Sequence, residues 1–226
     1  MKHLLYKDMK LCMVPMVPLF YGFALMLLIP SYPYLVAGFF TCNSIFYLFN
    51  QATMNKDLLF CALLPVSKRD MVKSRVWLMV LIEGGMLLLV LGMVFVNHLL
   101  HPMGNPAGLD GSLTLLGGML VLFAVFHLTF LPAYYAAPYR VGRHFFISTV
   151  SVFAWIILCE GFCILCAVGQ GVPLFDWVEG RLDCFPGTGA ALRAQLVCLG
   201  ISGGIYALCT LWASNRAQKA LQKACL

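Results

Sequence analysis

The sequence predicts an all-α integral membrane protein with six transmembrane helices, and three observations support this fold class. Hydrophobic residues make up 62% of the 226 residues and charged residues only 11%, whereas an average soluble domain carries about 25% charged residues. The apolar residues gather in six runs that approach the ~20 residues needed to span a bilayer. The basic residues gather in alternate connectors between these runs.

The six runs are continuous, which favours helices over barrel strands, because barrel strands alternate apolar and polar residues. The second run is the least regular. Pro30 and Pro33 crowd its start, and Asn43, Ser44 and Asn50 interrupt it. The predicted spans cover residues 11–28, 34–49, 76–96, 112–134, 145–168 and 191–212.

The first run follows Lys2, Lys7 and Lys10, an arrangement shared with secretory signal peptides. The run is too long for a cleaved apolar core, and no small-residue cleavage site follows it. We therefore expect a first span that is retained. Since no linker or low-complexity tract divides the chain, residues 1–226 are expected to form a single six-helix transmembrane domain.

The basic residues predict the orientation. Of the 15 Lys and Arg residues, all but Arg181 and Arg193 lie before run one, between runs two and three, between runs four and five, or after run six. An even number of spans places these four segments on one side, so both termini are expected in the cytoplasm. The net charge of +6 then reflects topology, and the partner it indicates is the lipid bilayer, with no nucleic acid.

Most of the ten cysteines fall in predicted spans, and only Cys184 is expected to face outward, so a disulfide framework is not predicted. Cys159, Cys163 and Cys166 share one helix face. Three thiols on one helix converge poorly on a tetrahedral metal ion, so we expect packing and no metal site.

The connector between runs two and three is unusually charged. It begins at residues 55–57, continues through an apolar stretch long enough for about two helical turns, and reaches Pro65, which ends a helix. Ser67 then precedes Asp70 by three residues, the spacing of a capping box. We expect a short amphipathic helix along the inner membrane face, a sharp turn at Pro65 and Val66, and a second helix that continues into span three.

Two roles are open for the basic residues of this connector. They could enforce topology and bind anionic lipid head groups, with about 1 kcal/mol from each. That role does not require the additional short helix. A rigid cytoplasmic helix joined to a spanning helix could instead transmit force from a soluble partner to span three.

Residues 55–75 read N-x-D-x(6)-L-P-V-S-K-R-D-M-V-K-S-R, and this pattern resembles the motif of the bacterial type-2 ATP-binding-cassette exporter permeases. The resemblance extends to the chain length, the topology and an outer segment between spans five and six. It departs from the family at Val76 and Trp77, because an aromatic residue usually follows the Arg directly. It implies a type-2 exporter fold in the bacterial cytoplasmic membrane, with a coupling helix between spans two and three.

The resemblance also implies the permease subunit of an ATP-driven exporter, with a substrate pathway at a dimer interface. The 226 residues contain no G-x-x-x-x-G-K-[ST] stretch to hold ATP phosphates. The chain is therefore not expected to be an enzyme; ATP and Mg would be bound by a separate ATPase subunit, and a second permease, identical or not, would complete the dimer. The partner-coupling residues would be Lys56, Asp57, Leu58, Phe60, Leu64, Pro65, Val66, Ser67, Lys68, Arg69, Asp70 and Lys73.

Two acidic residues fall inside predicted spans, Glu83 in the third and Glu160 in the fifth. An ionised side chain in the bilayer centre is costly, so each is expected to face the bundle or a wet cavity. They could line a substrate pathway, or they could be hydrogen-bonded to neighbouring helices. For His127, which has no evident partner in the sequence, packing is expected.

Two other functions remain possible from the sequence. The substrate-binding membrane component of a vitamin or micronutrient uptake system is also about six spans long, but it would not need a basic coupling helix. An intramembrane enzyme would show paired catalytic groups such as H-E-x-x-H or G-x-S-x-G. H-E-x-x-H does not occur, and the single G-x-S-x-G match, residues 200–204, lies within the sixth apolar run. Peptide, lipid and antibiotic substrates would all suit an apolar pathway.

Overall fold

The computed structural model describes residues 2–12, 16–29, 31–63, 66–100, 105, 108–169, 171–184 and 189–223, and this part of the chain is helical, as predicted. The helices in chain order are α1 (Lys2–Cys12), α2 (Met16–Tyr21), η1 (Gly22–Leu28), α3 (Val36–Met54), α4 (Asp57–Ala62), α5 (Lys68–Leu100), α6 (Leu113–Ala136), η2 (Pro138–Arg140), α7 (Val141–Val168), α8 (Pro173–Arg181) and α9 (Gly189–Lys223).

Four helices in the described ranges are long and apolar enough to cross a membrane: α5, α6, α7 together with η2, and α9. They correspond to predicted spans three to six. The 33 residues of α5 extend about 50 Å at 1.5 Å per residue, well beyond a hydrocarbon layer of about 30 Å. Helix α9 likewise continues past the predicted end at residue 212 to Lys223.

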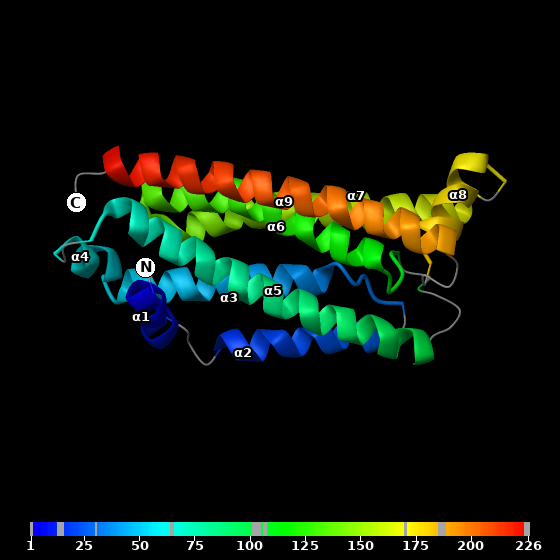
Figure 1. Ribbon diagram of the computed structural model, residues 1–226, viewed down its shortest axis with the longest axis horizontal. Coiled ribbons are helices and arrows are strands. Elements are labelled where there is room, and N and C mark those ends of the chain that lie inside the picture. The colour runs from blue at the N-terminus through cyan, green and yellow to red at the C-terminus, as the bar shows by residue number, and fades with distance from the viewer. Residues whose placement is uncertain are drawn as a thin grey trace.

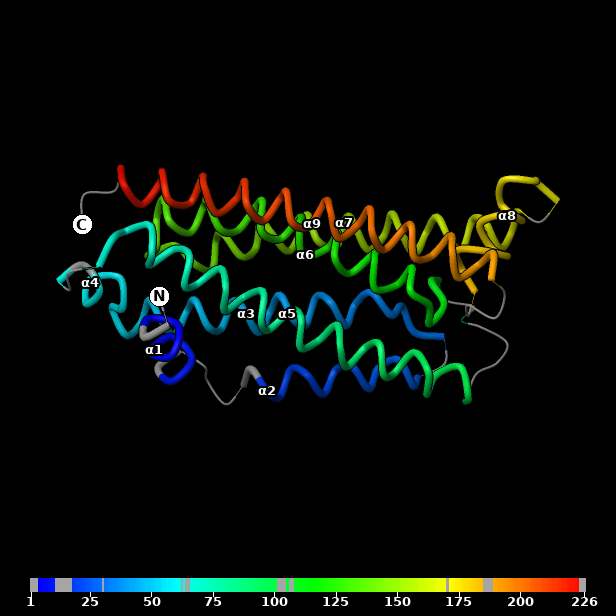
Figure 2. The backbone as a smooth tube through the Cα atoms, in the orientation of Figure 1, coloured from blue at the N-terminus to red at the C-terminus, as the bar shows by residue number. Residues whose placement is uncertain are grey.

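The first predicted span differs from the expectation. Its first two residues belong to α1, and the described residues from Met16 onward form α2 followed by seven residues of 3₁₀ helix in η1. Figure 2 shows α1 at the same end of the bundle as α4. A 3₁₀ helix rises about 2.0 Å per residue, so η1 covers more length than an α-helix with the same number of residues.

The long helices lie side by side along the longest axis of the molecule (Figure 1). Helix α6 contacts both α7 and α9, while α5 contacts η1 and α1. In α6, 56% of the residues in an apolar 18-residue stretch are buried inside the protein. The corresponding share is 17 to 33% in the other three candidate spanning helices. This difference makes α6 the central helix, as its nearly uniform apolar sequence favours.

Aromatic side chains fill the core between α3 and α6. Phe49 of α3 packs edge-on against Phe130 and Tyr134 of α6, with ring centroids 5.2 and 4.6 Å apart. Large apolar side chains also cover the outside, for example Leu88, Ile157 and Leu208, each more than two-thirds exposed. A surface of this kind is stable in lipid and not in water.

Candidate functional site

The charged connector folds as predicted at the start of α5. The Ser67 hydroxyl accepts a hydrogen bond from the Asp70 backbone N–H at 3.1 Å and donates one to Asp70 Oδ2 at 2.7 Å. This confirms the side-chain cap at Ser67, although the Asp70 carboxylate binds the serine hydroxyl and not its backbone N–H. Helix α5 then runs without a break into the third predicted span.

The predicted short helix before it is α4, which begins after a sharp reversal of the chain at Lys56, where φ is +52°. Its six residues end at Ala62, so it is slightly shorter than the predicted two turns. The predicted coupling residues Leu64 and Pro65, of which Pro65 also belongs to the predicted turn, lie outside the described residues. Val66 and Ser67 precede α5 without helical structure.

A buried ionic cluster joins α1, α4 and α5 at this end of the bundle. Arg75 Nη2 of α5 lies 2.6 Å from Asp57 Oδ2 of α4 and 3.2 Å from Asp8 Oδ1 of α1. Lys7 Nζ of α1 lies 2.6 Å from Asp57 Oδ1. The Ser74 hydroxyl donates to Asp8 Oδ2 at 2.8 Å. Two carboxylates are thus shared between two cations that belong to different helices.

The cluster is shielded from solvent. Asp8, Asp57 and Arg75 are only 2, 8 and 5% exposed. Burial by itself lowers the pKa of Lys7, but its hydrogen bonds to Asp57 and Cys61 and the charge of Asp8 raise it by more, so the pKa lies above its ordinary value. Lys7 therefore stays charged, and α4 cannot shift without straining its contacts to both α1 and α5.

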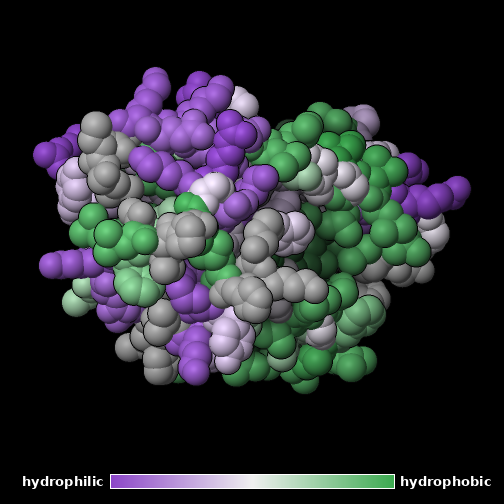
Figure 3. Space-filling view, turned by 60° about the vertical axis from the view of Figure 1, so that its left-hand side comes forward, coloured by the Kyte–Doolittle hydropathy of each residue, from purple (hydrophilic) through white to green (hydrophobic). Residues whose placement is uncertain are grey.

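The opposite face of α4 is apolar and uncovered. Leu59, Phe60 and Leu63 are 51, 54 and 86% exposed, while Asp57 points into the cluster. Figure 3 views the molecule from this end and shows hydrophilic and hydrophobic residues side by side on it. A short helix held by buried charges and carrying a protruding apolar face is suited to contact a soluble protein.

The predicted coupling residues separate into groups in the structure. Lys56, which directly precedes α4, and Phe60 of α4 are exposed, whereas Asp57 is buried and Leu58 is half-buried. Lys68 donates a hydrogen bond to the Leu221 carbonyl of α9 at 3.4 Å. Arg69 and Lys73 are exposed on α5.

Glu83 lies in a buried polar cluster between three helices. Its carboxylate contacts His127 Nε2 of α6 at 2.8 Å and accepts a hydrogen bond from the Tyr206 hydroxyl of α9. His127 Nδ1 lies 2.8 Å from the Thr210 hydroxyl. Glu83 is 1% exposed and His127 is fully buried, so within one chain Glu83 faces the helix bundle and fits the hydrogen-bonded alternative.

Glu160 of α7 ties together two backbone segments at the other end of the bundle. Its carboxylate accepts hydrogen bonds from the Leu35 N–H at the start of α3, at 3.1 Å, and from the Leu109 N–H before α6, at 2.7 Å. A Cβ atom on the neighbouring Gly108 would lie 1.8 Å from Glu160 Oε2, and the φ of Gly108 is +148°. Glycine is therefore required there, and the carboxylate has a structural task.

Among the described residues, no set of three or more His, Cys, Asp or Glu side chains is arranged to hold a metal ion. Cys163 and Cys166 are buried in α7, and Cys159 is half-buried. The segment between α7 and α9 contains the nine-residue helix α8.

Sequence patterns missed the partners that complete these sites. Asp8 is the one acidic residue among three lysines in residues 2–10. This isolated position is the only feature of the sequence that distinguishes it. Leu59 and Leu63 are four residues apart, which places them on one face of a helix. Neither was among the coupling residues predicted from the motif. The Glu83–His127 contact joins residues 44 apart, which no local pattern encodes.

Comparison with protein families matches residues 3–174 to the family described as ABC-2 family transporter protein. The matched stretch includes α1, the α4–α5 connector and the helices that carry Glu83, His127 and Glu160. Comparisons with curated proteins and with solved structures gave no match.

Proposed function

Because the chain belongs to the ABC-2 family of transporter proteins, we propose that it is the membrane-spanning permease subunit of an ATP-driven exporter. Family membership and the apolar helices make it a multi-pass membrane component of a transporter and not an enzyme. In the proposal, a separate ATPase subunit binds ATP and Mg and carries out hydrolysis. Two permease chains, identical or related, enclose the substrate pathway at their interface.

The observation that carries this proposal is the joint between α4 and α5. Asp57 of α4 and Arg75 of α5 lie 2.6 Å apart inside the buried cluster, and α5 is continuous from its cap to residue 100. A displacement of α4 by a soluble partner would therefore be passed to α5 as a rigid motion. The proposed docking surface is the exposed side of α4 with its two flanking residues, namely Lys56, Leu59, Phe60 and Leu63.

The proposed topology has six spans: α2 with η1, α3, α5, α6, α7 and α9. The termini, α1 and α4 are in the cytoplasm, and α8 is outside. Figure 1 supports this topology, since α1, α4 and the end of α9 lie at one end of the bundle and α8 at the other. The basic residues Lys7, Lys68 and Lys219 belong to the end assigned to the cytoplasm.

Site-specific photocrosslinking in native membranes tests the proposal. A photoreactive phenylalanine analogue at position 60 should capture a chain that contains a G-x-x-x-x-G-K-[ST] phosphate-binding motif, as identified by mass spectrometry. The same analogue at Val168, which is 80% exposed at the opposite end of α7, is the matched control. Capture of such a chain from both positions, or from neither, would contradict the proposed docking surface.

A functional measurement follows once that ATPase is identified. The double variant Leu59→Asp and Phe60→Asp should insert normally but fail to co-purify the ATPase, because the exposed apolar anchors carry the contact. Undiminished co-purification would contradict the assignment of α4 as the coupling helix.

A further inference from the structure

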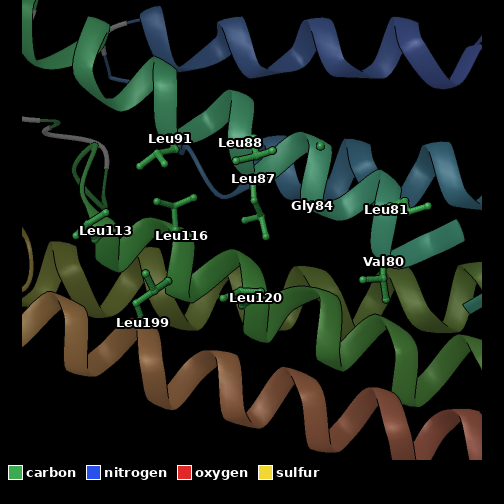
Figure 4. A pocket seen from close by; sticks show the side chains of 11 residues that line it. Val80, Leu81, Gly84, Leu87, Leu88, Leu91, Leu113, Leu116, Leu120 and Leu199 are labelled. Carbon is green, nitrogen blue, oxygen red and sulfur yellow. The ribbon is translucent and has the colours of Figure 1, made fainter. Parts of the chain in front are cut away.

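An apolar groove separates α5 from α6 and α9. Its volume is about 640 Å³, within the range of about 300–1,000 Å³ typical of small-ligand sites. Leu87 and Leu91 of α5 face Leu116 and Leu120 of α6 across it, and Leu199 of α9 lies at one end (Figure 4). Every residue that lines the groove is an aliphatic residue or glycine.

The groove is open in the middle of α5. A Cβ atom added to Gly84 would meet no other atom within 4 Å, and Leu81 and Leu88 on either side are 50 and 72% exposed. Between residues 80 and 91 the helix rises about 17 Å. The groove therefore follows the spanning helix over about half of a hydrocarbon layer and opens toward the lipid.

Two basic side chains extend the same face of α5 beyond the groove. Val80, Gly84, Leu87 and Leu91 follow Lys73 by 7, 11, 14 and 18 residues, a spacing that keeps all five on one side of a helix. Arg69 precedes Lys73 by one turn, and both side chains are exposed. Neither forms an ion pair with another described residue.

Trp77 lies between the cations and the groove, four residues after Lys73, and it is 54% exposed. Tryptophan favours the head-group level of a bilayer. From one end to the other, the face thus presents two exposed cations, an interfacial aromatic side chain and an aliphatic channel. This is the order of phosphate, glycerol and acyl chain in a phospholipid.

We propose that this face of α5 is a binding site for one anionic phospholipid, whose phosphate contacts Lys73 and Arg69 and whose acyl chain fills the groove. Charge selects this occupant over a second copy of the chain. Two copies in one membrane have the same orientation, so a two-fold contact through this face would bring their Lys73 and Arg69 side chains together. The site does not depend on the ATPase partner of the proposed function.

Native mass spectrometry tests the site. The protein is released from nanodiscs of equal parts phosphatidylglycerol and phosphatidylcholine, and the retained lipid is weighed. Wild-type protein should retain one phosphatidylglycerol per chain in preference to phosphatidylcholine. Gly84→Leu should lose this lipid, because its side chain occupies the groove. Gly92→Leu is the matched control, since Gly92 is exposed on the same helix, also has open space around its Cβ position and does not line the groove.

A second variant tests the head-group contact without touching the packing. Lys73→Gln should lower phosphatidylglycerol retention roughly fivefold, the effect of one basic group near an anionic lipid, and leave phosphatidylcholine retention unchanged. Equal retention of both lipids by the wild type would overturn the proposal. So would unchanged retention in Lys73→Gln, or a dimer that Gly84→Leu dissociates, since the groove would then be a protein interface.

Discussion

Arg75 shows how charged side chains are accommodated in a chain with so few of them. It is 5% exposed and contacts two carboxylates, one on α1 and one on α4. Glu83 and Glu160 follow the same rule, because each carboxylate receives two hydrogen bonds from groups on other helices or connectors. Buried ionisable side chains are tolerated in this protein where the fold supplies complementary groups.

Replacing Arg75 with Met should lower the free energy of unfolding by about 3–5 kcal/mol, the usual cost of removing one partner from a buried ion pair. Asp8 and Asp57 would remain buried, with Lys7 the remaining cation of the cluster. Thermal or denaturant unfolding in detergent measures the loss. Lys219→Met, on the exposed side of α9, should change stability by no more than about 0.5 kcal/mol. Equal stability of the two variants would contradict the role assigned to the cluster.

Glu83 offers a test between its two sequence-based roles. Glu83→Ala leaves His127 and Tyr206 without their acceptor, so the free energy of unfolding should fall by about 1–3 kcal/mol. Glu83→Gln keeps an acceptor oxygen and should cost less. If Glu83→Gln folds like the wild type but abolishes transport, the substrate-pathway role is supported instead.

At the scale of elements, the connector before α6 is held by acidic groups. Asp110 accepts a hydrogen bond from the Asn105 N–H, and its own N–H donates to Asp183 Oδ1 at 2.7 Å. The pKa of Asp110 is raised to about 6, chiefly by burial and to a smaller extent by the charges of Asp183 and Glu179, while the hydrogen bond from Asn105 lowers it. Burial also raises the pKa of Asp183. The two carboxyl groups thus hold protons more tightly in the folded protein than in the unfolded chain.

This shift predicts greater stability in mild acid. Between pH 3.8, the ordinary pKa of Asp110, and pH 6, the folded state binds more protons than the unfolded state. Stability therefore falls as the pH rises through this interval and is lowest above it. The melting temperature of the wild type should drop between pH 4.5 and 7.5 by more than that of Asp110→Asn, which keeps an uncharged acceptor. An identical drop in both proteins would contradict the assignment.

At the scale of the whole molecule, the arrangement of the helices reflects the alternation of basic and acidic connectors. The end with α1 and α4 carries the basic segments, and the end with α8 carries Asp110, Asp176, Glu179 and Asp183. Within the described part of the chain, four helices are long and apolar enough to span a membrane, while α2 with η1 and α3 are shorter or more polar. The six-span topology therefore depends on where the connector between η1 and α3 lies.

Cysteine labelling at Ser31 resolves this point. Ser31 is exposed between η1 and α3. In a Cys184→Ser background, Ser31→Cys should react with a membrane-impermeant maleimide added outside intact cells, because the six-span topology places it there. Lys56→Cys, in the next connector, should react only after the membrane is opened. Protection of Ser31→Cys from the outside reagent would favour a bundle in which the first two segments do not cross.

The sequence by itself determined the features that depend on local pattern. The apolar runs predicted α5, α6, α7 and α9 with boundaries extended by a few turns at most, because hydrophobicity and length are properties of contiguous residues. The cap at Ser67 and the continuity of α5 also followed from short-range spacing. The motif in residues 55–75 indicated the family to which residues 3–174 were then matched.

Only the tertiary structure decided which residues meet. Asp8 and Arg75 are 67 positions apart, Glu83 and Tyr206 are 123 apart, and Leu35 and Glu160 are 125 apart. The packing of α1 against α5 and the groove beside Gly84 likewise arise from how whole helices pack. Hydrophobic pattern fixes which face of a helix is buried, but the partner of a buried polar group depends on the register of two helices, and no contiguous stretch of sequence encodes that register.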